Sequence, residues 1–340
     1  MDLLLTAILL GALFCCTLFK AKVHPAGNDT FFNKENSVAL RGIWCIIVIL
    51  VHIPAQYGNA LQNIAGSFAY IGVTFYFMAS GYGLSLGVIQ NNGLKKGFWQ
   101  KRLPKLLLSQ LLVNICAAVL FWALLGDGIT LSTILWVARW LRWLLACYVV
   151  FWLTHKLCKK QNIANAMIGA GVLILSIGQY VLKNAGVLNE TIWPTEILGF
   201  LWGILLANLA AKFQNFGKQK WLFKAAILCI AAALLGILYL KFKTVLVWGD
   251  YLLKIALGLA ILVFMLFLNT KISLGNKALT FLGGISYEMY LSHTVIISLI
   301  QRLCPELTSG IFIWLVILGS FALSLMVQSV SKLLLKPLQQ

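Results

Sequence analysis

Residues 40–52 read LRGIWCIIVILVH, an apolar stretch with a cation near its start and an imidazole at its end. In an α-helix, the eleven steps from Arg41 to His52 rotate by about 1100°, roughly 20° more than three turns. The two side chains therefore share one face and lie about 16 Å apart along the helix axis. A titratable group in a lipid-embedded helix indicates a functional site. A buried His that hydrogen-bonds to a neighbouring helix fits the same stretch.

The composition around this stretch is that of a membrane protein. Of the 340 residues, 61% are hydrophobic and 11% are charged, whereas soluble domains average about 25% charged residues. Apolar runs near twenty residues recur, each long enough to cross a bilayer as a helix. We therefore expect an all-α, polytopic transmembrane helix bundle of about ten or eleven spans without a soluble domain. The candidate spans are 3–19, 38–57, 67–89, 106–125, 143–157, 163–182, 193–211, 225–241, 250–269, 278–299 and 310–331.

The basic residues lie in alternating connections. Twenty of the 27 Lys and Arg residues fall in 20–41, 91–105, 155–160, 212–224, 271–277 and the tail 332–340. The positive-inside rule then predicts a multi-pass protein of the inner (plasma) membrane, with its N-terminus outside and its C-terminus in the cytoplasm. Arg41 would lie at the cytoplasmic surface and His52 toward the external half. The net charge of +18 follows this topology and does not indicate a nucleic-acid partner.

Two segments need separate interpretation. Residues 1–34 are expected to form an additional N-terminal transmembrane helix and a cytoplasmic linker, because the start lacks the basic region of a signal peptide. Residues 126–142 are expected to form an interfacial or re-entrant helix at the outer surface, since Arg139 and Arg142 interrupt an aromatic run. The membrane core would then be 35–332, followed by a cytoplasmic tail, 333–340. The eight cysteines show no metal-ligand spacing and are expected to be core residues.

Four further stretches carry recognisable patterns. They are GVTFYFMASGY at 72–82, FWQKRLPK at 98–105, EILGFLWG at 196–203 and GISYEMYLSH at 284–293. Together with the Arg41–His52 spacing, they resemble in order the motifs of acyltransferase family 3, whose members include bacterial O-acetyltransferases of polysaccharides and cell-wall glycans. The resemblance covers roughly residues 35–332.

This chain departs from the family pattern at a few positions. Val38 stands where the family usually has an acidic residue, and Pro104 is displaced from the usual downstream proline. Lys105 replaces the second Arg of the basic motif, which keeps the charge but loses the bidentate fork. The additional N-terminal span is also not typical of the family core.

The residues suit a transfer that begins in the cytosol, where acyl-CoA is found. Acyl-CoA carries phosphates, and the basic residues of 91–105 lie with Arg41 at the predicted cytoplasmic mouth. The same loop is also what the positive-inside rule and anionic lipids produce without any specific site. The resemblance implies that Arg41, Arg102 and Lys105 bind acyl-CoA as a co-substrate. No other cofactor and no metal is expected.

The resemblance also implies that His52 is catalytic. It could act as a general base toward the acceptor hydroxyl, or as a nucleophile that carries the acyl group. An unperturbed imidazole pKa of about 6.5 suits proton transfer near neutral pH.

Further polar residues could line the same cavity as His52. Ser286, Tyr290 and His293 share a helical face within about 40°, and interhelical hydrogen bonding is the alternative for all three. Ser80 and Tyr82 are candidates for the cavity wall, although Ser80 with Gly81 also suits close helix packing. The complete set of candidate wall residues is Ser80, Tyr82, Ser286, Tyr290 and His293.

Two acidic residues are expected to be structural. Glu196 follows Trp193-Pro194 and is interpreted as a helix N-terminal cap. Glu288 lies about 160° from Ser286 and is expected to face another helix.

The sequence thus predicts a membrane O-acyltransferase. It would move an acetyl group from acyl-CoA to a hydroxyl of an extracytoplasmic glycan or lipid-linked sugar. Its remaining partners would be membrane lipids and, if catalysis needs one, a separate soluble chain. The alternatives are a transporter or flippase for a polysaccharide precursor, and a non-catalytic scaffold or sensor. The six prolines do not show the paired broken helices that a transporter would favour.

Overall fold

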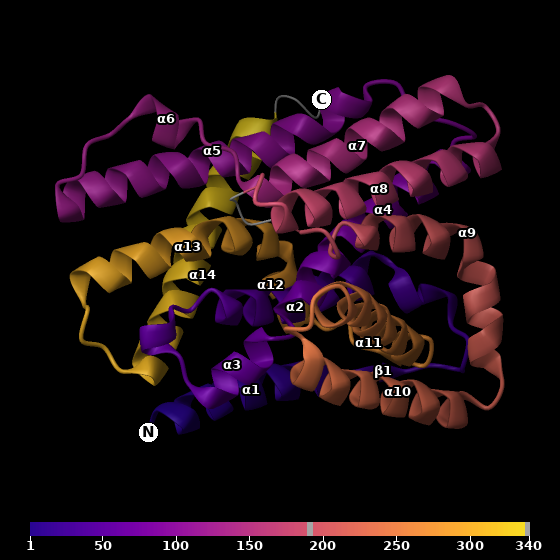
Figure 1. Cartoon of the computed structure of the whole chain (residues 1–340), viewed down its shortest axis with the longest axis horizontal. Helices are drawn as coiled ribbons and strands as arrows, with labels where there is room; N and C mark the ends of the chain where they lie inside the picture. Colours follow the sequence, from indigo (N-terminus) through magenta and orange to yellow (C-terminus); the bar gives the residue numbers. More distant parts are fainter. Residues whose placement is uncertain (189–192, 337–340) are drawn as a thin grey trace.

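The computed structural model describes residues 1–188 and 193–336, and these are almost entirely helical. Several long helices run roughly parallel to the long axis of the molecule, and their connections gather at its two ends (Figure 1). The long helices are α1 (Asp2–Leu18), α2 (Lys34–Val51), α4 (Ala69–Gln90), α5 (Phe98–Leu125), α7 (Arg139–Leu157), α8 (Gln161–Asn184), α9 (Leu198–Lys218), α10 (Trp221–Phe242), α11 (Lys254–Asn269), α13 (Ser286–Leu303) and α14 (Ser309–Leu335). Short elements connect them: the 3₁₀ turns η1 (Asp29–Phe32) and η2 (Ala55–Tyr57), the helices α3 (Ala60–Gly66), α6 (Leu131–Ile134) and α12 (Lys277–Gly284), and the π-helical turn η3 (Trp248–Leu253).

This architecture confirms the prediction of a polytopic helix bundle. Within the described residues, six helical segments are long and apolar enough to cross a membrane. Each of the eleven sequence-predicted spans overlaps a helix. Large apolar side chains are buried between the helices, and many others remain on the outer surface, as expected where lipid is the solvent. The chain is therefore a multi-pass membrane protein.

Two predicted spans are shorter or broken. The first, 38–57, ends as a helix at Val51, because Pro54 cannot continue the hydrogen-bond ladder and the chain turns through η2 into α3. The second, 278–299, is two helices that meet at Ile285. Gly283 lies so close to α2 that any added Cβ would collide with the carbonyl oxygen of Val38.

The prediction of a helix over 126–142 was wrong. Only the four residues of α6 are helical within 126–138, and Arg139 already belongs to α7. Polar side chains of α5 bind the rest of this segment. The Asn114 side-chain amide donates to the Trp136 carbonyl at 2.6 Å, and the side-chain oxygen of Gln110 accepts from the Ala138 N–H at 3.3 Å. These bonds replace the internal hydrogen bonds that a longer helix would have supplied.

An ion pair joins this segment to the far end of α13. Asp127 and Arg302 form a bidentate pair, with the second contact at 2.8 Å. The hydrogen bonds from Arg302 lower the pKa of the exposed Asp127 carboxyl.

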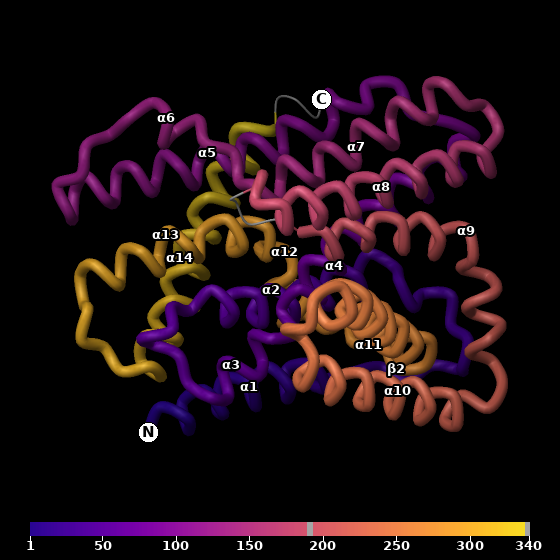
Figure 2. The backbone as a smooth tube through the Cα atoms, in the orientation of Figure 1, coloured from indigo at the N-terminus to yellow at the C-terminus, as the bar shows by residue number. Residues whose placement is uncertain are grey.

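Helices α4 and α9 pack side by side in the most extensive helix–helix contact of the described residues, near the middle of the molecule (Figure 2). Gly199 and Gly203 of α9 face the carbonyl oxygens of Thr74 and Met78 so closely that a Cβ at either glycine would collide with them. Gly81 of α4 faces Phe200 in the same way. Small residues at such spacing let two membrane helices approach closely, and this contact fixes the residues just before α9 beside α4.

A two-residue strand pairing joins two loops far apart in the sequence. β1 (Lys22–Val23) pairs antiparallel with β2 (Ile272–Ser273). Asn36 at the start of α2 supports the pairing, because its side-chain oxygen accepts from the Ser273 hydroxyl at 2.6 Å and from the Gly275 N–H at 2.9 Å. The two loops therefore lie on the same side of the bundle.

Candidate functional site

His52 lies at the point where α2 ends. Its Nδ1 is 2.8 Å from the carbonyl oxygen of Val48, one turn earlier. A carbonyl oxygen only accepts hydrogen bonds, so Nδ1 carries the proton of the neutral imidazole and Nε2 keeps its lone pair. An imidazole with a free Nε2 can take a proton from a hydroxyl or attack an acyl carbon.

His52 forms part of the wall of a cavity of about 600 Å³. Volumes of this size are typical of small-molecule sites. The wall combines apolar side chains of α2 and α4 with polar and aromatic residues from more distant segments. Its polar and aromatic members besides His52 are Gln62, Asn63, Ser67, Tyr70, Trp193, Glu196, Tyr239, Lys243 and Lys254.

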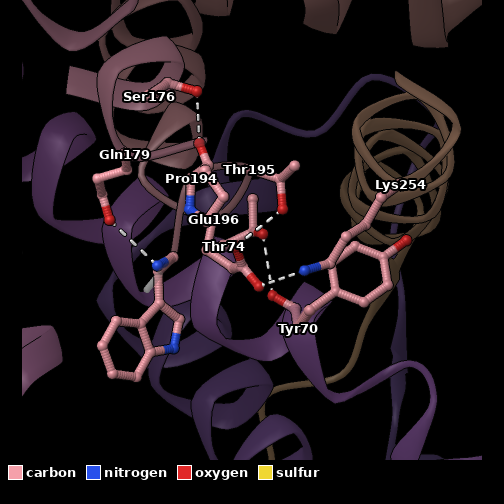
Figure 3. Close-up of polar contacts among 9 residues, drawn as sticks. Tyr70, Thr74, Ser176, Gln179, Pro194, Thr195, Glu196 and Lys254 are labelled. Carbon is pink, nitrogen blue, oxygen red and sulfur yellow. Dashed lines mark hydrogen bonds and ion pairs between the residues drawn. The ribbon is translucent and has the colours of Figure 1, made fainter. Parts of the chain in front are cut away.

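An ion pair lies in this wall (Figure 3). The Lys254 ammonium donates to Glu196 at 2.7 Å, and the second carboxylate oxygen accepts from the Thr195 hydroxyl at 2.8 Å. The Glu196 side chain is 5% exposed and that of Lys254 is 20% exposed. The ammonium also sits 4.8 Å from the centre of the Tyr70 ring. Charges held in so apolar a setting are costly and mark functional sites in membrane proteins.

The interpretation of Glu196 as a helix cap was wrong. Helix α9 begins at Leu198 after Ile197, and no side chain caps it. The carboxylate instead bonds to Thr195 and Lys254. Two side chains of α8 bond to the backbone just before Glu196 (Figure 3). The side-chain oxygen of Gln179 accepts from the Trp193 N–H at 3.2 Å, and the Ser176 hydroxyl donates to the Pro194 carbonyl.

A second imidazole lies against His52. The rings of His52 and His293 are 4.6 Å apart and meet edge to face. His293 is 2% exposed, and neither of its ring nitrogens has a hydrogen-bond partner among the described residues. The ring centre of Tyr290 lies 5.5 Å from that of His293, and the Tyr290 ring also contacts the rings of Trp140 and Tyr76.

These aromatic rings lead from His52 toward Arg41. The Tyr76 hydroxyl donates to the Arg41 carbonyl at 3.1 Å. The Arg41 guanidinium lies within electrostatic range of the Tyr76 and Tyr148 hydroxyls, and Arg102 lies in range of Tyr148 as well. The structure therefore gathers Arg41 and Arg102 at one end of an aromatic path whose other end is the histidine pair.

The remaining predicted residues lie at other positions. Lys105 is exposed, and the cation of Arg102 stacks over the Phe98 ring at 4.3 Å instead. Ser80 lies beside the Tyr148 hydroxyl, and the Tyr82 ring packs against Phe32. The Ser286 hydroxyl bonds to the Gly283 carbonyl. None of the five residues predicted to line the cavity borders the one beside His52. Tyr290 borders a separate hollow of about 10 Å³, together with Tyr76 and Trp140.

Glu288 does face another helix, as expected. Its carboxylate accepts from Ser109 of α5 at 3.1 Å. Among the described residues, no group of three or more His, Cys, Asp or Glu side chains is arranged to hold a metal ion.

Lys254, Tyr70 and Trp193 also belong to the site, although the sequence did not predict them. A lysine within an apolar predicted span was the available signal, because such a charge usually has a partner and a function. Its partner Glu196 comes from another segment, and helical spacing within one segment cannot connect the two.

The bundle and its histidine-lined cavity define a multi-pass membrane protein with an internal polar site. Comparison with family models matches residues 38–328 to one described as an acyltransferase domain. The chain belongs to this family, acyltransferase family 3, and is an acyltransferase that transfers groups other than aminoacyl groups. Comparisons with curated proteins and with solved structures found no match.

Proposed function

We propose that this acyltransferase moves an acetyl group from cytosolic acetyl-CoA to a hydroxyl of an extracytoplasmic glycan or lipid-linked sugar. The observation that supports this most directly is the position of His52. It follows the last residue of α2, lies in the wall of a cavity of about 600 Å³ and has an Nε2 that is not used in its hydrogen bond to Val48. Arg41, on α2, would lie toward the end that the positive-inside rule predicts to be cytoplasmic.

The residues divide into a donor end and an acceptor end. Arg41 and Arg102 would bind the phosphates of CoA, because guanidinium groups form charge-assisted bonds to phosphate oxygens. The aromatic rings of Tyr76, Tyr290 and Trp140 would enclose the acyl-bearing arm and exclude water from the thioester. The cavity beside His52 would hold the acceptor.

The transfer exchanges one acyl bond for another. With His52 as general base, Nε2 takes the proton of the acceptor hydroxyl while the hydroxyl oxygen attacks the thioester carbon. The carbon–sulfur bond breaks, an ester forms, and the CoA thiolate receives the proton from the imidazolium. With His52 as nucleophile, Nε2 attacks the thioester carbon and CoA leaves as the thiolate. The acceptor hydroxyl then takes the acyl group from Nε2, and its proton passes to the thiolate. His293, packed against His52, would fix the orientation of the ring in either case.

The test measures label transfer from radiolabelled acetyl-CoA into membrane glycan, in vesicles that carry wild type or His52→Ala at matched expression. We expect label with wild type and at least a hundredfold less with His52→Ala, since general acid–base groups contribute about 10² to 10⁴ in rate. His24→Ala serves as a control that removes an imidazole outside the cavity wall.

Each outcome decides a part of the proposal. Equal label from wild type and His52→Ala would remove His52 from the mechanism. An absence of label from both would contradict acetyl-CoA as the donor. Protein-bound label that survives a rapid quench near neutral pH only with wild type, and that acid or hydroxylamine releases, would select the nucleophile over the base, because an acyl-imidazole is labile to both.

A further inference from the structure

The wall of the cavity beside His52 has the chemistry of a saccharide site. Trp193 and Tyr239 supply aromatic surface, on which the apolar face of a sugar ring can stack. Glu196 and Asn63 supply acceptors, and Lys254 supplies donors, for ring hydroxyls. Few small ligands other than sugars combine an apolar face with many hydroxyl groups.

One hydroxyl in this wall lacks a partner. Tyr70 is 9% exposed, and its hydroxyl has no hydrogen bond among the described residues. The Tyr70 ring underlies the Lys254 ammonium, next to the ion pair with Glu196 (Figure 3). A buried hydroxyl without a bond costs free energy that a bound polar group would recover.

The charges of the wall do not balance. Glu196 contributes one negative charge, whereas Lys254 and Lys243 contribute two positive charges. Lys254 is neutralised by Glu196 at 2.7 Å. Lys243 is exposed, and among the described residues it donates only to the neutral Ser67 hydroxyl, at 3.1 Å. Within residues 1–188 and 193–336, one cation of the cavity wall is therefore available to an anionic group.

We infer that this cavity is the acceptor subsite and that it takes an anionic saccharide. Its ring would lie against Trp193 and Tyr239, with hydroxyls bonded to Glu196, Lys254 and Tyr70. Its phosphate or carboxylate would bind Lys243. Calling this cavity the acceptor subsite rests on the proposed function, whereas saccharide binding can be measured without turnover.

The experiment measures binding to the full chain in phosphatidylcholine nanodiscs, so that no anionic lipid competes. Saturation-transfer NMR titrations compare N-acetylglucosamine 1-phosphate with N-acetylglucosamine, and glucuronic acid with glucose. Glycerol 1-phosphate is the probe for an anion without a sugar ring. The variants are Lys243→Gln and the matched control Lys241→Gln, an exposed cation of the same segment that is not part of the wall.

We expect one or both acidic sugars to bind wild type about three- to fivefold more tightly than the neutral partner, the range of an exposed ion pair. Lys243→Gln should abolish this preference and leave neutral-sugar binding unchanged. Lys241→Gln should keep the preference.

Three results would overturn the inference: no preference in either sugar pair, equal loss of preference in both variants, or glycerol 1-phosphate binding as tightly as the sugar phosphate. The last result would indicate a lipid headgroup or simple anion site. Failure of acetyl transfer with the sugar preference intact would contradict the proposed function alone. Intact transfer without a sugar preference would contradict the subsite alone.

Discussion

At the scale of single residues, the ion pair of Glu196 and Lys254 is the least expected feature of the site. Both side chains are mostly buried, and their 2.7 Å contact lies in the wall of the cavity. Pairing two charges in such surroundings gains little over a well-packed apolar pair, because both must be desolvated. Its position in the cavity wall that His52 also lines therefore argues for a role with a ligand, and its stability effect can be measured separately.

We expect Glu196→Gln to destabilise the protein by about 3 kcal/mol, since it leaves the Lys254 charge without its partner. The double variant Glu196→Gln, Lys254→Met should recover most of this loss, because it removes the unpaired charge as well. Thermal unfolding of the two variants and of Lys254→Met alone in nanodiscs provides the complete cycle. Additive losses from the two single variants would show that the pair is not energetically coupled.

At the scale of elements, the α4–α9 contact determines where Glu196 lies. Gly81 faces Phe200 of α9, so an added methyl group must push the helices apart. Gly83, two residues further along α4, has open space around its Cβ position. The two glycines thus share a helix but differ in their packing.

We expect Gly81→Ala to destabilise the protein by about 1–3 kcal/mol, the usual cost of overpacking, and to reduce acetyl transfer. Gly83→Ala should change stability by no more than about 1 kcal/mol, in the stabilising direction, because alanine favours the helix. Unfolding temperature and transfer rate are measured for both variants. Similar losses from the two substitutions would place the effect within α4 and contradict a role for the helix contact.

The sequence predicts elements well where one segment holds all the information. Long apolar runs located α8 and α10, and the eleven-residue spacing predicted one helix for Arg41 and His52, where α2 contains Arg41 and ends just before His52. The sequence-based prediction failed where contacts with a second segment determine the local structure. The break at Ile285 depends on Gly283 packing against Val38, and the extended chain before Arg139 depends on bonds from Gln110 and Asn114.

The same limit applies to the site. The motif resemblance singled out His52 and His293, which the fold brings to 4.6 Å. It could not pair Glu196 with Lys254, because the two residues belong to different segments. Glu196 lies just before α9, and Lys254 is the first residue of α11. Local rules accordingly favoured a helix cap for Glu196.

At the scale of the whole molecule, the side of the membrane on which each loop lies decides whether the chemistry is possible. The pairing of β1 with β2 places the loops near 22 and 272 on one side. Eight predicted spans separate those loops, and an even number of crossings returns the chain to the side where it began. The positive-inside rule assigns that side to the cytoplasm, which would place Arg41 and Arg102 where acyl-CoA is found.

We expect thiol labelling to reproduce this topology. In a background without the other cysteines, Cys304, which is exposed between α13 and α14, should react with a membrane-impermeant maleimide on intact cells. A single cysteine from Lys96→Cys, in the exposed loop before α5, should react only after permeabilisation. Retained acetyl transfer in both single-cysteine proteins provides the control for folding. Labelling in the reverse pattern would place Arg41 and Arg102 outside the cell, where no cytosolic thioester could reach them, and a donor other than acyl-CoA would then be required.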